Sequence, residues 1–345
     1  MKNISIINAC TDLGLNIDGA KNGSELLTKD LDLKNIIEKH TLNAKSKKDK
    51  KMEKEEIDSS SIQGYFEKFN SMLLQMHELH FEKDMTDDEE KEYNKKMHNL
   101  VIAVKELDSV REKRNLKQIN EFNEELYNKV LEILENGNFP LTVGGDHIIA
   151  IASSLASLKK NPNQGIIWFD AHADYNTYST SVTGNLHGLP LAVATNYENT
   201  ILANFHNGPF YNPKNTVIVG GRDIDPWEWG NVLDAGVTVF STEDIKKYGV
   251  EEICKKAFDI ASNGTDGVHI SYDLDLIDPE VAPGVSIPAS NGINFEETYS
   301  LAKEIAKYGN LIKSADLVEY NPVFDKDDQT KKIAQDILKI WIENF

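Results

Sequence analysis

The chain has 345 residues, a formal net charge of −19 and a hydrophobic content of 40%, the composition of an acidic globular protein. This charge disfavours nucleic acid or an anionic membrane surface as a partner. The two cysteines, Cys10 and Cys254, have no metal-ligand or redox spacing. No stretch approaches the roughly 18 apolar residues of a membrane helix, and the first apolar run is too short for a signal peptide. We therefore expect a cytoplasmic protein.

Short β-branched runs alternate with helical patterns along most of the chain. The runs that predict strands are Ile4–Asn8, Pro140–Val143, Gly165–Phe169, Thr216–Val219, Val237–Phe240, Val268–Tyr272 and Ile312–Val318. Apolar residues at helical spacing from Ile119 to Leu134, closed by Gly137, predict one helix, and Ser241-Thr242 opens another. This alternation predicts an α/β fold, in which a mostly parallel sheet is sandwiched between helices in three layers.

The stretch 43–116 has a different composition. Lys47–Glu56 is nearly all charged, and two amphipathic patterns follow it, over residues 62–79 and 93–107. We expect this stretch to be an inserted charged run with a helical hairpin, within a single α/β domain that spans residues 1–345.

Polar strings follow several of the predicted strands. They are Gly144-Gly145-Asp146-His147, Asp170-Ala171-His172-Ala173-Asp174 and Asp273-Leu274-Asp275. Side chains alternate along an extended chain, so Asp170, His172 and Asp174 would share one side of the backbone, as would the two aspartates of the last string. Ligands of such sheets gather at the carboxyl ends of the strands. The strings therefore predict one shared site.

The strings bring together four carboxylates and two imidazoles, more negative charge than buried strand ends tolerate without a cation. This ligand set contains no thiolate and suits a fairly hard divalent ion such as Mn²⁺, and it is too large for one tetrahedral zinc. Two metal ions fit better than one. The predicted ligands are His147, Asp170, His172, Asp174, Asp273 and Asp275. Asp146 either orients the His147 imidazole or satisfies the Gly-Gly turn, and both alternatives stay open.

Six strings, in order and spacing, resemble the ureohydrolase family and within it arginase. They are GGDHIIA (144–150), DAHADYN (170–176), TGNLHGLPLA (183–192), GGRDIDPWE (220–228), SYDLDLIDP (271–279) and LVEYNP (317–322). The resemblance covers the chain from about Phe139 to Pro322, and Ile4–Ala20 fits more weakly. It implies an α/β sheet fold, a site with two manganese ions, hydrolysis of a guanidinium group to urea and an amine, and assembly into homo-trimers or hexamers.

The resemblance also implies roles for individual residues. It assigns the same six ligands to the metal ions. His187 would relay protons, Glu319 would pair with the substrate guanidinium, and Asp174 would orient the attacking hydroxide while it ligates metal. The implied substrate contacts are Asn176, Thr183 and Asn185 at a carboxylate, and Asp225 and Glu228 at an α-amino group.

Some positions depart from the usual arginase pattern. Thr183 stands where serine is more common, Trp227 where glycine is common, and Val285-Ser286-Ile287-Pro288 replaces a Thr-Gly-Thr-Pro-like turn. The expected reaction is hydrolysis of L-arginine to L-ornithine and urea by a hydroxide that bridges the metal ions. A ureohydrolase for agmatine, guanidinobutyrate or formiminoglutamate is an alternative. A third is a non-catalytic metal-binding relative that uses 43–116 as a partner-binding surface.

Overall fold

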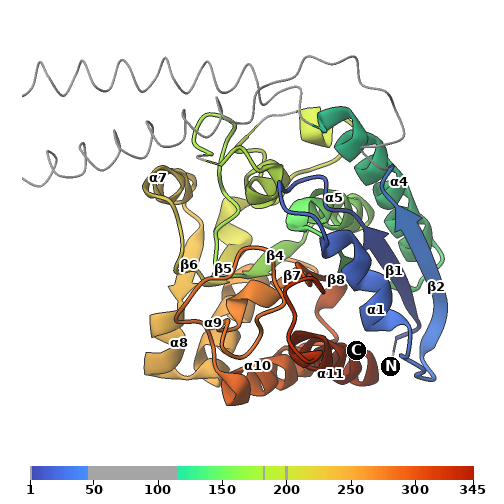
Figure 1. Ribbon diagram of the computed structural model, residues 1–345. Coiled ribbons are helices and arrows are strands. Elements are labelled where there is room, and N and C mark those ends of the chain that lie inside the picture. Colours follow the sequence, from blue (N-terminus) through green and yellow to red (C-terminus); the bar gives the residue numbers. More distant parts are fainter. Residues whose placement is uncertain (1, 46–114, 182, 199–200) are drawn as a thin grey trace, which may run out of the picture. The chain divides into compact units, whose positions relative to one another are not determined.

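The computed structural model describes residues 2–45, 115–181, 183–198 and 201–345. These residues contain an eight-stranded sheet with the strand order β2-β1-β3-β8-β7-β4-β5-β6 (Figure 1). The strands are β1 (Ile4–Cys10), β2 (Ile36–Asn43), β3 (Phe139–Gly144), β4 (Gly165–Phe169), β5 (Thr216–Gly220), β6 (Thr238–Ser241), β7 (Val268–Asp273) and β8 (Ile312–Val318). All neighbouring strands pair in parallel. The predicted α/β class with a mostly parallel sheet is confirmed.

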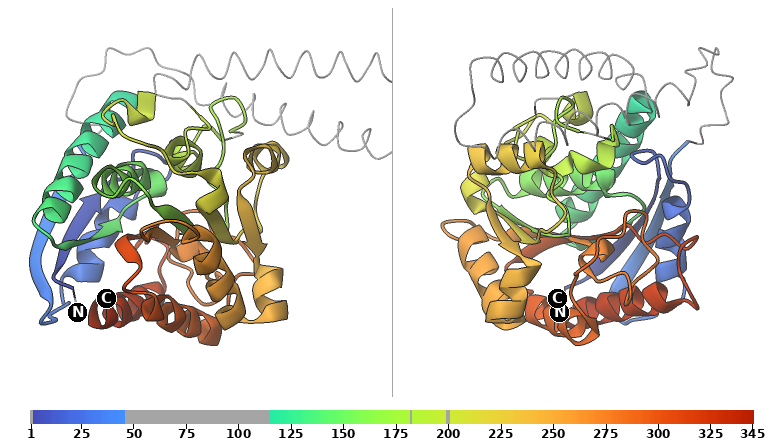
Figure 2. Two further views of the ribbon diagram at one scale, coloured as in Figure 1. Left: turned by 180° about the vertical axis from the view of Figure 1, so that it is seen from behind. Right: turned by 60° about the vertical axis from the view of Figure 1, so that its left-hand side comes forward.

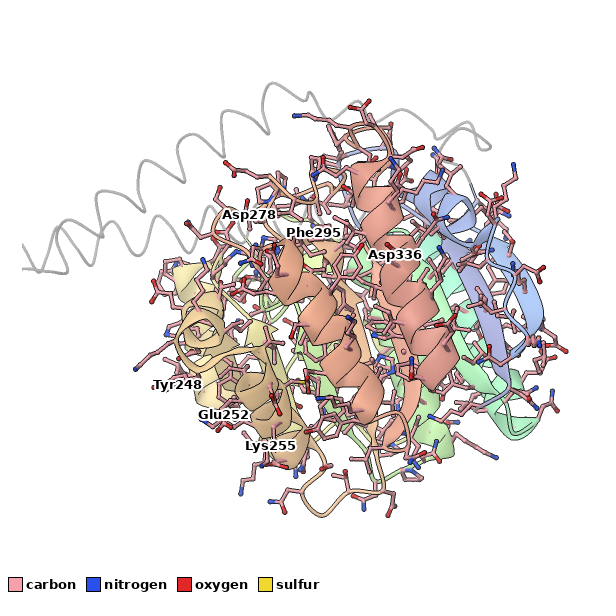
Figure 3. The ribbon with its side chains drawn as sticks, turned by 90° about the horizontal axis from the view of Figure 1, so that it is seen from below. Tyr248, Glu252, Lys255, Asp278, Phe295 and Asp336 are labelled. Carbon is pink, nitrogen blue, oxygen red and sulfur yellow. The ribbon has the colours of Figure 1, made fainter. Side chains whose placement is uncertain are left out.

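Helices cover both faces of the sheet (Figure 1; Figure 2). They are α1 (Gly23–Thr28), α4 (Leu116–Glu135), α5 (Ala150–Lys160), α6 (Pro190–Ala194), α7 (Pro226–Ala235), α8 (Thr242–Tyr248), α9 (Val250–Ala261), α10 (Phe295–Lys307) and α11 (Gln329–Asn344). Figure 3 shows α9, α10 and α11 side by side on one face, whereas α4 and α5 lie on the other. Of the helices in the described residues, none is long and apolar enough to cross a membrane.

The middle of the sheet is buried on both faces. Every residue of β3, β4, β5 and β7 is buried, and this burial explains why these strands are almost continuous apolar runs in the sequence. The predicted bounds of β4 and β8 match the observed ones. The polar strings that follow β3, β4 and β7 therefore begin on a rigid, buried support.

The sequence pattern does not predict β2, and this is the main error in the expected fold. Most of its residues are exposed or half-buried. β2 is the edge strand and pairs only with β1 in the described sheet. Glu38, Lys39 and His40 follow its first two isoleucines, and charged side chains of this kind commonly protect an edge strand from pairing with another chain. They also remove the alternation of polar and apolar residues that reveals a strand.

Two predicted helix ends are confirmed. α4 is followed by Gly137 at φ 79°, whose N–H donates to Leu134 O over 3.1 Å. Ser241 precedes α8 and forms a capping box with Asp244. The Ser241 hydroxyl accepts from Asp244 N over 3.1 Å, and the Asp244 carboxylate accepts from Ser241 N over 2.8 Å.

The chain divides into two compact units. One comprises residues 1–45, 117–177 and 185–345, and the other comprises residues 46–116 and 178–184. The whole sheet belongs to the first unit. The predicted charged run and helical hairpin lie outside the described residues. Only the ends of the stretch 43–116 are described, where Asn43 closes β2 and Leu116 opens α4.

Candidate active site

The six predicted ligands meet at the carboxyl edge of the sheet. β3, β4 and β7 each lead into one of the polar strings, and β8 lies between β3 and β7 in the sheet. The turn after β3 requires glycine, because a Cβ on Gly145 would lie 1.8 Å from Thr11 O. Asp146 N donates to the same carbonyl over 3.1 Å. This tight turn places His147 directly above the ends of the neighbouring strands.

The His147 side chain is the centre of the first group of ligand atoms. Its Nδ1 lies 3.1 Å from Asp170 Oδ2, 3.1 Å from Asp174 Oδ2 and 3.0 Å from Asp273 Oδ2. One imidazole N–H can donate to only one of these oxygens at a time. The arrangement therefore leaves carboxylate oxygens without adequate positive partners in a buried site.

A second group of ligand atoms shares Asp170 with the first. His172 Nδ1 lies 2.9 Å from Asp275 Oδ2 and 3.5 Å from Asp170 Oδ1. His147, Asp170 and Asp273 could hold one metal ion, and Asp170, His172 and Asp275 could hold another. Two adjacent groups with one shared carboxylate are the arrangement expected for a pair of ions.

The electrostatics of the cluster call for added positive charge. Burial, followed by the charges of its neighbours, raises the pKa of Asp273 well above its usual value and that of Asp275 to about 6. Burial lowers the pKa of His147, but the surrounding carboxylates raise it by a larger amount, so the net shift is upward. Asp174 Oδ2 is buried and has no hydrogen-bond partner among the described residues. Two divalent ions would neutralise the four carboxylates, so the residues present fit them.

Two residues that sequence reasoning missed hold the ligands in place. Ser271 Oγ lies 2.8 Å from His147 Nε2, which leaves Nδ1 as the ligating nitrogen. Trp168 stacks on the His147 ring with centroids 4.1 Å apart, and its Nε1 donates to Asp170 Oδ2 over 2.9 Å. Ser271 stands two residues before Asp273, and Trp168 stands two residues before Asp170. Side-chain alternation in a strand could therefore have identified both supporting residues.

Asp146 supports the turn rather than the imidazole. Its Oδ1 accepts from Ile148 N, and its Oδ2 accepts from Gly14 N, both over 3.0 Å. Gly14 O in turn accepts from His187 N over 3.3 Å. A Cβ on Gly14 would lie 2.9 Å from Asp146 Oδ1, so this contact requires glycine. The early segment of the chain thus links Asp146 to His187, a role that the sequence gives no sign of.

His187 and Glu319 form a pair beside the metal ligands. His187 Nδ1 lies 3.0 Å from Glu319 Oε1, which also accepts from His147 N over 2.8 Å. Glu319 Oε2 is buried and has no hydrogen-bond partner among the described residues. Burial lowers the pKa of His187, but the Glu319 carboxylate more than offsets this and raises it above its usual value.

Backbone conformation also marks this site. Asp174 has φ 49° and Glu319 has φ 68°, in the left-handed region that costs a residue other than glycine about 1 kcal/mol or more. Local strain of this kind gathers at functional sites. Both residues are ones that the sequence singles out.

The predicted substrate-binding residues occupy several positions. Glu228 is buried on α7, and its Oε1 accepts from Tyr175 N over 2.8 Å. Burial, opposed by that N–H and reinforced by Asp174, raises the pKa of Glu228 to about 8. Asp225 is the residue before α7 and is half-buried, and its side chain does not cap the helix.

The loop residues among these predictions divide between the two compact units. Asn176 is buried, and its N–H donates to Gly188 O over 3.1 Å, so the loop that follows Asn185 is joined to the metal-binding string. Asn185 is half-buried at the start of a short 3-10 helix, Leu186–Gly188. Thr183 is exposed and belongs to the second compact unit.

Comparison with known proteins gives the family. The model of the arginase family matches residues 4–341, and this chain therefore belongs to the arginase family. The arginase of Bacillus subtilis (strain 168) is 39% identical over 229 residues, which cover 66% of this chain and 77% of that protein. The arginase of Brevibacillus brevis is 40% identical over 223 residues, which cover 64% of this chain and 74% of that protein.

A solved structure supports the same assignment over a longer stretch. The native arginase of Bacillus caldovelox superposes with a TM-score of 0.77 at 26% identity, over 99% of this chain and 98% of that one. The resemblance to ureohydrolases is confirmed. Membership of the family makes this protein a hydrolase that acts on guanidino or amidino groups.

Proposed function

We propose that this protein hydrolyses L-arginine to L-ornithine and urea at a centre of two Mn²⁺ ions. The observation that carries the proposal is the meeting of two groups of buried ligands, with Asp170 shared, beside the His187–Glu319 pair. The similarity of this chain to arginases supports arginine as the substrate. The charge of four carboxylates supports a count of two divalent ions, because two such ions would neutralise them.

The six ligand residues would hold the ions and prepare the site for attack on a guanidinium carbon. When bound, a pair of divalent ions lowers the pKa of water and so supplies a nucleophile at neutral pH. The chain contributes the fixed geometry. Ser271 and Trp168 prevent rotation of His147 and Asp170, and burial keeps competing water from the carboxylates.

Glu319 is suited to bind the guanidinium group. Its Oε1 is committed to His187 and to the backbone of His147, but its Oε2 has no partner in the described residues. A guanidinium N–H can donate to Oε2, and the buried setting strengthens this contact because little water competes for it. Glu319 would thereby fix the direction in which the guanidinium carbon faces.

His187 is suited to deliver the proton that the leaving amine requires. The contact with Glu319 occupies Nδ1 and leaves Nε2 to exchange protons. The neighbouring Glu319 carboxylate raises the pKa of His187 and so favours the form that can donate a proton. Attack of hydroxide would form a C–O bond at the guanidinium carbon, and the C–N bond to the substrate side chain would break as His187 donates its proton to that nitrogen, which would give urea and ornithine.

Two carboxylates at the amino end of α7 favour a substrate that has an α-amino group. Glu228 is buried beside Tyr175, and Asp225 stands at the amino end of the helix. An ammonium group placed between them would relieve the cost of burying Glu228 in its charged form. Asn176 and Asn185 would donate to the substrate carboxylate.

The experiment that tests this function is a urea-release assay with the purified protein after Mn²⁺ loading. We expect release of urea and ornithine from L-arginine and a content of two metal ions per chain by elemental analysis. Glu319→Gln is the matched control, because it keeps the size of the side chain and removes its charge, and we expect it to keep the metals and lose most of the activity. Absence of urea from every guanidino compound in the fully loaded protein would reject the proposal.

A further inference from the structure

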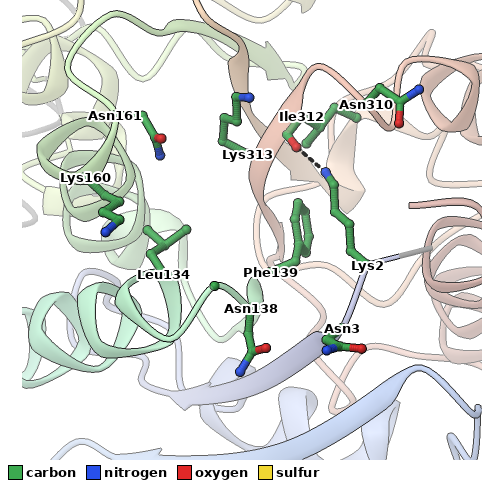
Figure 4. Close-up of a pocket in the computed structure, with 11 residues that line it drawn as sticks. Lys2, Asn3, Leu134, Asn138, Phe139, Lys160, Asn161, Asn310, Ile312 and Lys313 are labelled. Carbon is green, nitrogen blue, oxygen red and sulfur yellow. Dashed lines mark hydrogen bonds between the residues drawn. The ribbon is translucent and has the colours of Figure 1, made fainter.

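The amino edge of the sheet contains a cavity of about 460 Å³, at the opposite end of the strands from the candidate active site (Figure 4). Phe139 begins β3 and Ile312 begins β8, and Lys2 and Asn3 precede β1. All three strands are parallel, so their amino ends lie together. Nothing in the proposed reaction uses this cavity.

The lining of the cavity is basic and amide-rich. Lys2, Lys160 and Lys313 contribute three positive charges, and no lining residue is acidic. The amides come from Asn3, Asn138, Asn161 and Asn310. This is unusual in a chain whose net charge is −19, because a random patch of its surface would contain more carboxylates than ammonium groups. Among the described residues, none of the three lysines forms an ion pair.

The apolar residues of the cavity offer little surface to a ligand. Leu134, Phe139 and Ile312 line it but are all buried. Figure 4 shows Lys160 and Asn161 on one side of the space, Lys2 and Asn310 on the other, and Lys313 between them. The size is that of a small-molecule site, and the groups that can reach a ligand in it are mainly ammonium and amide groups.

The positions of the lysines leave their positive charge largely unbalanced. Burial, and then the charge of Lys313, lowers the pKa of Lys2 to about 8. The Lys2 ammonium donates to Gly309 O over 2.7 Å and to Ile312 O, and it stands 4.4 Å from the centre of the Phe139 ring. These groups hold the ammonium in place without neutralising it. Lys160 lies in the last turn of α5, where the helix dipole favours a positive charge. Lys2 and Lys313 are not in that turn, so the dipole does not explain their presence.

We propose that this cavity is a binding site for a small anion that carries a phosphate or carboxylate group, with that group held by the three lysines. The ammonium groups and the asparagine amides would donate to the anion. A phosphate dianion would balance more of the positive charge than a carboxylate would, so phosphate is the preferred group.

The proposal can be tested by calorimetric titration with phenyl phosphate, benzoate and inorganic phosphate, on Mn²⁺-loaded and on metal-free protein. We expect one site per chain that binds phenyl phosphate and inorganic phosphate more tightly than benzoate, with the same affinity in both preparations. Equal affinity separates this cavity from the metal cluster, whose attraction for an anion would disappear with the metals. Failure of the protein to release urea would leave this expectation unchanged, because no metal ligand takes part.

Neighbouring lysines provide a matched control. Lys160→Gln and Lys313→Gln each remove one charge from the cavity, and we expect each to weaken binding of phenyl phosphate at least about tenfold, the effect of one charge-assisted hydrogen bond. Lys159→Gln removes the same charge from the same turn of α5. Its ammonium instead donates to Asn207 Oδ1 over 2.8 Å, so we expect a change below about twofold.

Several results would overturn the proposal. It is wrong if phenyl phosphate does not bind, if binding requires the metals, or if Lys159→Gln weakens binding as much as Lys160→Gln does. All three lysines are partly or fully exposed, so the variants should remain folded, and circular dichroism checks this directly. Equal binding by wild type and both cavity variants would place the anion elsewhere.

Discussion

Asp174 combines a buried carboxylate oxygen that has no hydrogen bond among the described residues with a left-handed backbone. Asparagine adopts that backbone readily, so Asp174→Asn should keep the fold while removing one negative charge from the cluster. Asp275→Asn tests the second ligand group in the same way. We expect both variants to lose metal affinity by more than about a hundredfold, beyond the loss usual for residues that only support a ligand, and to lose nearly all urea release.

Asp223→Asn is the control for these two substitutions. Asp223 Oδ2 is 3.7 Å from His172 Nε2, but its side chain is 67% exposed, so water compensates for its loss. Metal content after dialysis, measured by elemental analysis, should match wild type in this variant alone. Normal metal content in both Asp174→Asn and Asp275→Asn would mean that the cluster does not hold the metals.

Ser271 allows a test of how the His147 ring is held. Ser271→Ala removes the partner of Nε2 without touching a ligand atom, and we expect the Mn²⁺ affinity to fall about 10- to 100-fold while the fold is kept. Ser157→Ala is the control, because Ser157 is also buried and its Oγ donates to Gln164 Oε1 over 3.1 Å, a residue outside the metal cluster. Titration with Mn²⁺ followed by calorimetry measures both. Equal losses in the two variants would indicate a general effect of a disturbed core.

His187 is expected to affect the rate and not the metals. His187→Asn removes the proton donor but no ligand atom, so the metal content should stay at the wild-type value while kcat falls by about 10²- to 10⁴-fold. Added imidazole should restore part of the rate. Loss of metal ions from this variant would instead make His187 a ligand.

Particular residues explain how far the sequence could predict this site. Asp170, His172 and Asp174 follow one buried strand, and alternation along an extended chain predicts that they lie together. They do lie together, although the chain bends after Phe169 and Asp174 has φ 49°. The contact between His187 and Glu319 joins residues 132 positions apart, and the support that Gly14 gives to Asp146 spans the same separation. Local patterns carry no information on such contacts. Here the resemblance to a family suggested the functional residues but not their hydrogen bonds.

At the scale of elements, predictions succeeded where burial shapes the sequence. β4 and β8 are buried almost throughout, and their bounds were predicted to the residue. β2 was missed because one side of an edge strand faces solvent and its backbone pairing with β1 places little restriction on its side chains. Its parallel register with β1 is set by residues distant in the sequence, so only tertiary structure reveals it.

The start of α8 provides an element-scale prediction. Ser241→Ala removes one half of the capping box and exposes an unpaired N–H at Asp244, so we expect it to lower the free energy of unfolding by about 1 kcal/mol. Ser262→Ala is the control. Its hydroxyl donates to Phe258 O at the end of α9, where the carbonyl keeps its helical partner Ser262 N. Urea denaturation followed by circular dichroism compares the two, and an equal loss would show that the capping box adds nothing.

Substrate choice belongs to the whole molecule, because the residues that would bind the backbone of an amino acid come from separate elements. Asp225 directly precedes α7 and Glu228 lies in its first turn, whereas Asn176 follows the metal-binding string after β4. The Glu228 contact with Tyr175 N fixes α7 against that string. A site with paired donors and acceptors leaves buried groups unsatisfied when a substrate lacks one of its polar groups.

We therefore expect kcat/KM for L-arginine to exceed that for agmatine, which lacks the carboxylate, by at least about 10²-fold.

4-Guanidinobutyrate lacks the α-amino group and isolates the role of α7. Asp225→Ala should raise KM for arginine, because it removes a carboxylate that would contact the substrate ammonium. The Asp225 side chain does not cap α7, so the helix should stay intact. The same variant should leave kcat/KM for guanidinobutyrate unchanged, because no ammonium is present to contact it. If wild type turns over agmatine or guanidinobutyrate as well as arginine, the hydrolytic chemistry stands, but the α7 carboxylates do not select an amino acid. The exposed Trp227 would then be the first residue to exchange for glycine.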